Sequence, residues 1–174
     1  LGETAYHAHL AVEWAMEMSN AVREINQDHR ARGLPEIGIG IGLNTGVMCV
    51  GDMGSNIRRS YTVIGDAVNL GSRLEGLSKT YGLDIVVSET TRKLATGYAW
   101  QELDSVRVKG KEQAVAIFWP MAPKDRLSPE AATELKTWKT FIKAYRAQDW
   151  DQCDMLLLNL LRMNEKRYLY QLYS

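Results

Sequence analysis

The chain has 174 residues, of which 45% are hydrophobic and 24% charged, and its 21 basic and 21 acidic side chains give a formal net charge of zero. This composition predicts one globular domain with an appendage and disfavours an unfolded chain, which would combine low hydrophobicity with high net charge. It also disfavours a protein that binds nucleic acid, because such a protein normally carries a basic surplus.

The first part of the chain predicts a long helix. Between Ala5 and about Arg32, apolar residues recur at helical spacing, namely Leu10, Trp14, Met18, Val22 and Ile25. Gly33 and Pro35 end the pattern. His7 and His9 lie two residues apart and therefore point to different sides of the helix, which argues against a metal site there.

The next segment changes to the period of a β-strand. Branched aliphatic residues at 37, 39, 41 and 43 alternate with glycines at 38, 40 and 42, so one face of the strand carries no side chains. We expect another element to approach that face closely. With residues 44–46 as a turn, residues 47–50 return as a second strand, which predicts a hairpin. Because a strand and not a helix follows Gly46, a dinucleotide-binding fingerprint is disfavoured.

Strands and helices alternate between residues 60 and 121. We expect strands at 60–64, 84–87, 100–108 and 114–119, a helix from Asp66 to about Lys79, and a short helix capped by Ser88. Asp66 is expected to cap its helix rather than to bind a metal. The resulting order after the first helix, β-β-β-α-β-α-β-β, predicts an α+β or mixed α/β domain over residues 1–122.

Residues 123–174 predict a helical tail. Ser128 before Pro129 and Glu130 is a typical helix start, and apolar residues follow at helical spacing. A leucine-rich helix is expected at 153–163 and a last one near Tyr168. The stretch 144–173 resembles one tetratricopeptide-type helix pair. Because a single pair cannot form a solenoid, we interpret the tail as a docking or capping element.

The cysteines and the apolar runs indicate in which cellular setting the chain is expected. Cys49 and Cys153 have neither metal-ligand spacing nor the pattern of a disulfide framework, so we expect a reducing, cytoplasmic setting. The longest apolar runs are far shorter than the roughly 20 residues that cross a bilayer. No membrane span is therefore expected in this chain, and a membrane anchor of the parent protein, if it has one, would lie elsewhere.

The most specific pattern is YTVIGDAVNLGSRLE, at residues 61–75. At about 100° per residue, Asn69 and Arg73 share one arc of the predicted helix and present an amide and a guanidinium side by side. On an arbitrary helix, such a pair would be a solvated flank with Arg73 paired to a carboxylate.

This stretch closely resembles the signature of the class III nucleotidyl cyclases, the family of adenylyl and guanylyl cyclases. Residues 40–46, 51–55 and 108–111 agree with the family as well, and the resemblance covers residues 1–121. It implies a ferredoxin-like nucleotidyl cyclase fold, an α+β sheet with helices on one face, here without its first strands. It also implies a lyase of intracellular signalling that converts a nucleoside triphosphate into a 3′,5′-cyclic monophosphate and pyrophosphate.

The resemblance assigns roles to individual residues. Asn69 would orient the ribose, and Arg73 would stabilise charge on the α-phosphoryl group. Thr62 matches the base-contacting position, where adenine-using members carry Thr or Asp and guanine-using members typically carry Cys, so ATP is expected rather than GTP. Lys109, or alternatively Lys111, would reach the terminal phosphates; the other interpretation of either is a solvated turn lysine.

The sequence departs from the family at the metal site. Family members bind two divalent ions, Mg or Mn, through two aspartates on early strands, and neither motif occurs here. The resemblance thus implies that the first third of a cyclase domain is missing, and we expect no metal ligand and no cyclase activity in this chain alone. Family active sites lie between two subunits, so the expected partners are ATP and a second cyclase domain, in a homodimer or another pair. The alternative is a non-catalytic regulatory or dimerisation module derived from a cyclase.

Overall fold

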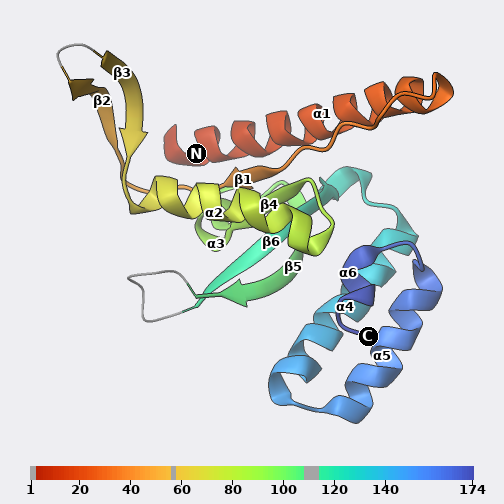
Figure 1. Ribbon diagram of the computed structural model, residues 1–174. Coiled ribbons are helices and arrows are strands. Elements are labelled where there is room, and N and C mark those ends of the chain that lie inside the picture. The colour runs from red at the N-terminus through yellow and green to blue at the C-terminus, as the bar shows by residue number, and fades with distance from the viewer. Residues whose placement is uncertain (1–2, 56–57, 108–113) are drawn as a thin grey trace.

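The computed structural model describes residues 3–55, 58–107 and 114–174. A four-stranded sheet has the order β1-β4-β6-β5, with β1 (Ile41–Leu43) parallel to β4 (Ile85–Ser88) and the other neighbours antiparallel. The remaining strands of this sheet are β5 (Tyr98–Val106) and β6 (Val115–Pro123). A separate hairpin of β2 (Cys49–Ser55) and β3 (Arg58–Ile64) stands clear of the sheet (Figure 1). The mixed α+β architecture is confirmed, and so is the predicted element order.

The prediction that residues 37–43 and 47–50 form a hairpin is wrong. β1 does not pair with the following strand; it pairs with β4, and β2 pairs with β3 instead. The alternation of side chains determines which face of a strand is buried, but it does not determine which neighbour forms the hydrogen bonds. The bare glycine face does receive a close neighbour, as expected. A Cβ on Gly42 would lie 2.1 Å from the carbonyl oxygen of Gly71, in helix α2 (Asp66–Tyr81).

Helices cover both faces of the sheet, so the expectation of helices on one face is wrong. On one face, α1 (Glu3–Ala31) and α3 (Glu89–Leu94) pack over a cluster that includes Ile85, Val87 and Phe118. On the other face, α2 and the tail helices pack over Val86 and Ile117. The alternating direction of Ile85, Val86 and Val87 along β4 divides the core between these two layers.

The long helix α1 packs through its small side chains. The face against the sheet includes Ala8, Val12 and Ala15, all fully or nearly fully buried, whereas Trp14 and Met18 are 58% and 52% exposed. The large apolar residues that predict the helix therefore lie mostly on its outer side. Short side chains let the helix axis approach the sheet closely, which explains why this face is the one that packs.

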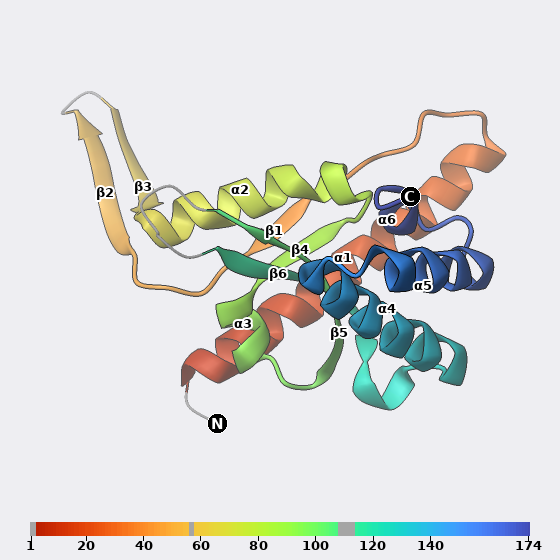
Figure 2. The same ribbon diagram turned by 90° about the horizontal axis from the view of Figure 1, so that it is seen from below.

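The tail consists of α4 (Pro129–Ala147), α5 (Trp150–Met163) and α6 (Tyr168–Gln171), preceded by a 3-10 turn, η1 (Lys124–Arg126). The Ser128 hydroxyl caps α4 by accepting a hydrogen bond from the backbone N–H of Ala131, as expected. The tail lies at the opposite end of the molecule from the β2–β3 hairpin (Figure 2). Its buried residues Trp138, Leu157 and Leu160 belong to the same hydrophobic cluster as Leu74 of α2 and Ile117 of β6. Sheet and tail therefore share one core.

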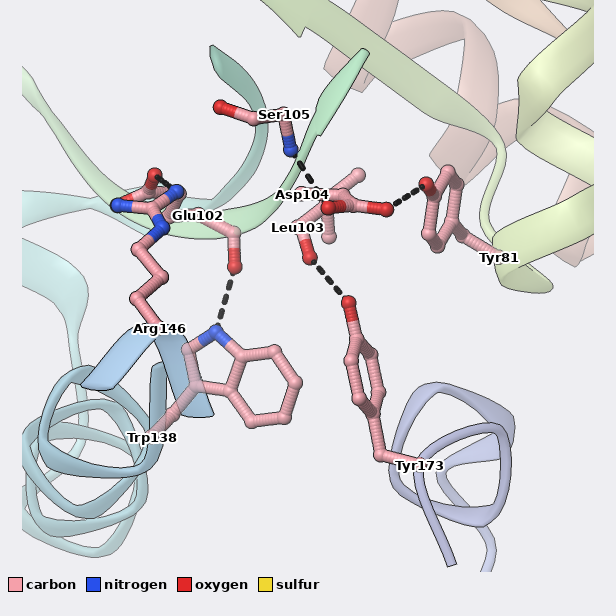
Figure 3. Close-up of polar contacts among 8 residues, drawn as sticks. All are labelled: Tyr81, Glu102, Leu103, Asp104, Ser105, Trp138, Arg146 and Tyr173. Atoms are coloured by element: carbon pink, nitrogen blue, oxygen red, sulfur yellow. Dashed lines mark hydrogen bonds and ion pairs between the residues drawn. The ribbon is translucent and has the colours of Figure 1, made fainter. Parts of the chain in front are cut away.

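A bulge in β5 provides the polar part of the contact with the tail. Leu103 is the extra residue, because Glu102 pairs with Phe118 while Asp104 pairs with Ile117. The carbonyl oxygen of Glu102 accepts a hydrogen bond of 2.5 Å from the indole N–H of Trp138, and that of Leu103 accepts one of 3.0 Å from the hydroxyl of Tyr173 (Figure 3). The Arg146 guanidinium pairs with the carboxylate of Glu102.

Candidate functional site

The candidate site lies where β3 runs directly into α2. Thr62 is in β3, and Asn69 and Arg73 are one turn apart in α2; all three side chains are exposed. Within the described part of the chain, no carboxylate lies within ion-pair distance of the Arg73 guanidinium. The structure therefore presents the amide and the guanidinium on open surface, where a ligand or a second subunit can reach them.

Two close contacts hold the first half of α2 against β1. The Asn44 side chain, which follows β1, donates a hydrogen bond of 2.9 Å from Nδ2 to the carbonyl oxygen of Ala67 in the first turn. Two turns along the helix, the backbone of Gly42 lies so close to Gly71 and Glu75 that no Cβ fits there. These contacts fix α2 to the sheet both before Asn69 and after Arg73.

The start of α2 differs from the expected cap. The residue before the helix is Gly65, at φ 151°, a conformation that favours glycine, and no side chain accepts a hydrogen bond there. Asp66 is the first helical residue, so the prediction that its side chain caps the helix is wrong. Its carboxylate still complements the positive end of the helix dipole from the first turn.

The far end of α2 is joined to β5. The hydroxyl of Tyr81 donates a hydrogen bond of 2.9 Å to Oδ2 of Asp104, and Oδ1 of Asp104 accepts one of 2.7 Å from the backbone N–H of Ser105 (Figure 3). Burial, followed by this hydrogen bond, raises the pKa of Tyr81. The phenol therefore stays protonated and donates throughout the neutral range.

The predicted phosphate-binding lysines, Lys109 and Lys111, lie outside the described residues. Strand β5 ends three residues before Lys109. The hydrogen bond from Trp138 to the β5 bulge and the hydrogen bond from Tyr81 to Asp104 are therefore both on the strand that precedes this lysine in the chain. Thr62, Asn69 and Arg73 come from one continuous segment, and their site roles stay predictions.

The described residues do not fit a two-metal centre. Among residues 3–55, 58–107 and 114–174, no group of three or more His, Cys, Asp or Glu side chains is arranged to hold a metal ion. In the same ranges, no helix is long and apolar enough to span a membrane.

Sequence reasoning missed the residues that position the site. The sequence pattern predicts a turn at Asn44, whereas its side chain holds α2, and no sequence pattern marks Tyr81 or Asp104. Their partners are 23 residues away in the chain, so no local pattern marks them. The available signal for Asn44 was its place directly after the glycine-faced strand, where an amide next to a close helix finds a backbone partner.

Comparisons with known proteins agree on one family. The family model for the adenylate and guanylate cyclase catalytic domain matches residues 2–121. An adenylate cyclase of Anabaena cylindrica is 38% identical over 120 residues, which is 67% of this chain and 24% of the relative. Adenylate cyclase 1 of Rhizobium meliloti is 34% identical over 113 residues, which is 64% of this chain and 17% of the relative. The chain therefore spans about a quarter or less of these relatives.

Solved structures give the same result. The adenylyl cyclase CyaB from P. aeruginosa superposes with a TM-score of 0.56 at 30% identity, over 68% of this chain and 62% of that one. The guanylyl cyclase Cya2 superposes with a TM-score of 0.55 at 32% identity, over 71% of this chain and 60% of that one. Both nucleotide specificities thus occur among the similar structures.

Proposed function

This chain belongs to the family of the adenylate and guanylate cyclase catalytic domain, and from that premise we propose that it supplies the ribose- and phosphate-binding half of an adenylate cyclase site. The observation that carries the proposal is the exposed pair of Asn69 and Arg73 on a helix fixed to the sheet by Asn44 and Gly42. Residues 1–122 would form the cyclase domain, and residues 123–174 would cap it.

The proposed reaction is an in-line displacement within ATP. The ribose 3′-oxygen attacks the α-phosphorus, the bond from that phosphorus to the bridging oxygen of pyrophosphate breaks, and the 3′-hydroxyl proton is released. The Asn69 amide would hold the ribose in the attacking geometry. The Arg73 guanidinium, permanently charged and planar, would stabilise the charge on the α-phosphoryl oxygens.

Base selection and leaving-group binding complete the proposal. Thr62 would accept or donate a hydrogen bond at the base edge, and its identity favours adenine over guanine. Lys109, with Lys111 as the alternative, would bind the terminal phosphates. Two Mg or Mn ions would neutralise the triphosphate in a complete domain, with ligands from a partner. Two free cysteines and the use of ATP support a cytoplasmic setting.

A paired site is supported by the β2–β3 hairpin. The described residues of this arm that are apolar and exposed include Val50, Tyr61, Val63 and Ile64, at 40% to 76% of their maximum exposure. Such an apolar arm, away from the core, is suited to a second cyclase domain. We expect a homodimer or a pair with another cyclase domain, measurable by sedimentation velocity.

Complementation tests the proposal. The 174-residue chain is mixed with a cyclase catalytic domain that retains its metal-binding aspartates but carries alanine at its own Asn and Arg positions. We expect cyclic AMP to form from ATP in the mixture and in neither protein alone. N69A/R73A is the matched control and should give none. Absence of cyclic AMP in the mixture, with complex formation shown by sedimentation, would overturn the proposal.

The second candidate is a non-catalytic regulatory or dimerisation module. It is favoured by the lack of a metal-binding cluster among the described residues. The two proposals differ in nucleotide binding. The module predicts that the mixed complex forms but does not bind ATP at the Asn69–Arg73 surface, whereas the enzyme half predicts ATP binding that N69A/R73A weakens.

A further inference from the structure

A cavity of about 540 Å³ lies beside α1, away from Thr62, Asn69 and Arg73. Its wall is formed by α1, the last residues of β6, η1 and the segment before α6. Three separate segments each place an arginine in this wall: Arg23, Arg126 and Arg167. In the part of the chain that the structure describes, no Asp or Glu lines the cavity. The convergence of three guanidinium groups without a lining carboxylate indicates a site for an anion.

Arg167 is held in place before any ligand binds. Its side chain is only 17% exposed, its Nε lies 3.1 Å from Oε1 of Glu134, and its Nη1 donates a hydrogen bond of 2.9 Å to Oε1 of Gln101. The guanidinium also lies 4.8 Å from the centre of the Trp119 ring. These contacts use two of the five N–H groups of a guanidinium, so N–H groups remain for an anionic ligand.

The other two arginines are at the edge of the cavity. The side chain of Arg23 is 58% exposed and lies 3.5 Å from Asp84, whose Oδ2 already accepts a hydrogen bond of 2.6 Å from the Ser19 hydroxyl. Within the described ranges, Arg126 has no carboxylate within ion-pair distance. Arg23 and Arg167 are thus each paired with one carboxylate, Asp84 and Glu134, and among the described residues Arg126 is the guanidinium of this cavity left available to a ligand.

The charged side chains that α1 contributes change from acidic in the adjoining cavity to basic in this one. An adjoining cavity of about 390 Å³, whose lining includes Glu13, Glu17 and Asp125, shares Met16, Asn20, Pro123 and Arg126 with it. An anion is therefore repelled from the acidic cavity and attracted to the arginine cavity. The arginine cavity also has an apolar wall that includes Ile85, Trp119 and Pro120. This combination suits a ligand with an anionic group on an apolar body.

We propose that this cavity binds a small organic oxyanion, a phosphate or carboxylate attached to an apolar ring or chain. The oxyanion lies between Arg167 and Arg126, and the apolar body lies against Trp119 and its neighbours. The ligand would contact α1, η1 and the tail together. The site is independent of the nucleotide surface on α2.

The test uses the full 174-residue chain and three probes of one shape. Phenyl phosphate, benzoate and benzyl alcohol are titrated at constant ionic strength and followed by calorimetry and by backbone amide NMR shifts. We expect saturable binding of phenyl phosphate or benzoate, with shifts at Ser19 and Met121, which line this cavity and not the acidic one, and no binding of benzyl alcohol. Which of the two anions binds more tightly identifies the ligand as a phosphate or a carboxylate.

Substitutions locate the site. R126Q should weaken binding of the anion roughly tenfold, the loss expected for one charge-assisted hydrogen bond. Because Arg126 is exposed and makes no described ion pair, this variant should fold normally. R162Q, at an exposed arginine of α5, is the matched control and should bind like the unaltered chain, and so should R73A. Equal binding by R126Q and R162Q, loss of binding in R73A, or no saturation with either anion would overturn the proposal.

Discussion

Tyr81 and Asp104 are joined by a hydrogen bond of 2.9 Å that ties the last turn of α2 to β5 (Figure 3). The helix carries the proposed ribose- and phosphate-binding residues, and the strand leads to the predicted phosphate-binding lysines. One part-buried hydrogen bond therefore helps to fix α2 relative to β5, the two elements that lead to the residues of the proposed reaction.

Tyr81→Phe should destabilise the chain by about 1–2 kcal/mol, because it removes one hydrogen bond and leaves Oδ2 of Asp104 without its donor. Urea denaturation measures the change in the free energy of unfolding. Tyr6→Phe is the matched control: Tyr6 is 57% exposed, so its hydroxyl should matter by less than about 0.5 kcal/mol. Equal stability of the two variants would contradict the assigned role of Tyr81.

Alkaline pH should destabilise the chain. Burial is the first cause that raises the pKa of Tyr81, of Tyr170 and of Tyr173 above the usual value for tyrosine. The folded state therefore favours the neutral phenols, while the unfolded state ionises near pH 10. The contribution to stability is complete below about pH 10 and is lost as pH rises above it. Unfolding free energies between pH 9 and 11 check the sign, and Tyr173→Phe should flatten the fall.

Gly42→Ala should displace α2 and destabilise the chain strongly. The new Cβ would lie 2.1 Å from the carbonyl oxygen of Gly71 and 2.3 Å from the backbone nitrogen of Glu75, both of which are backbone atoms that cannot rotate away. Gly38→Ala is the matched control, because a Cβ there meets nothing within 4 Å. Thermal melts of both variants decide the point: a similar melting temperature would show that helix and strand are not in this close contact.

Leu160→Ala should lower the stability of the whole chain by about 2–5 kcal/mol, because Leu160 is fully buried in the cluster shared by sheet and tail. Leu158→Ala changes a residue of the same helix that is 56% exposed, and it should cost much less. Unfolding is followed by far-ultraviolet circular dichroism. If Leu160→Ala unfolded the tail in a separate transition and left the sheet unchanged, the shared core would be refuted.

Local signals in the sequence predicted the elements well. The cap residues Ser88 and Ser128 marked helix starts that the structure confirms, and the glycines at 40 and 42 predicted the close approach of a neighbour. The pair Asn69 and Arg73 was placed on one helix face from spacing alone, and both are on the surface of α2.

The errors concern choices that depend on distant residues. The pattern of residues 41–43 suits pairing with a following strand as well as with a distant one. In the structure these residues pair with β4, which is itself buried on both faces. The apolar stripe of α1 predicts a helix but not its orientation, which the small residues Ala8, Val12 and Ala15 determine by close packing. The Asp66 carboxylate does not cap α2, because the residue before the helix is Gly65, whose positive φ favours glycine.

The four-stranded sheet ends at β1, whose outer side has no hydrogen-bonded neighbour among the described residues. Free backbone N–H and C=O groups along such an edge can template the growth of intermolecular β-structure. Ile37, 44% exposed, adds an apolar side chain just before the strand. Because β1 is only three residues long, this edge offers few such groups, and a second chain that pairs there would gain little from backbone hydrogen bonds alone.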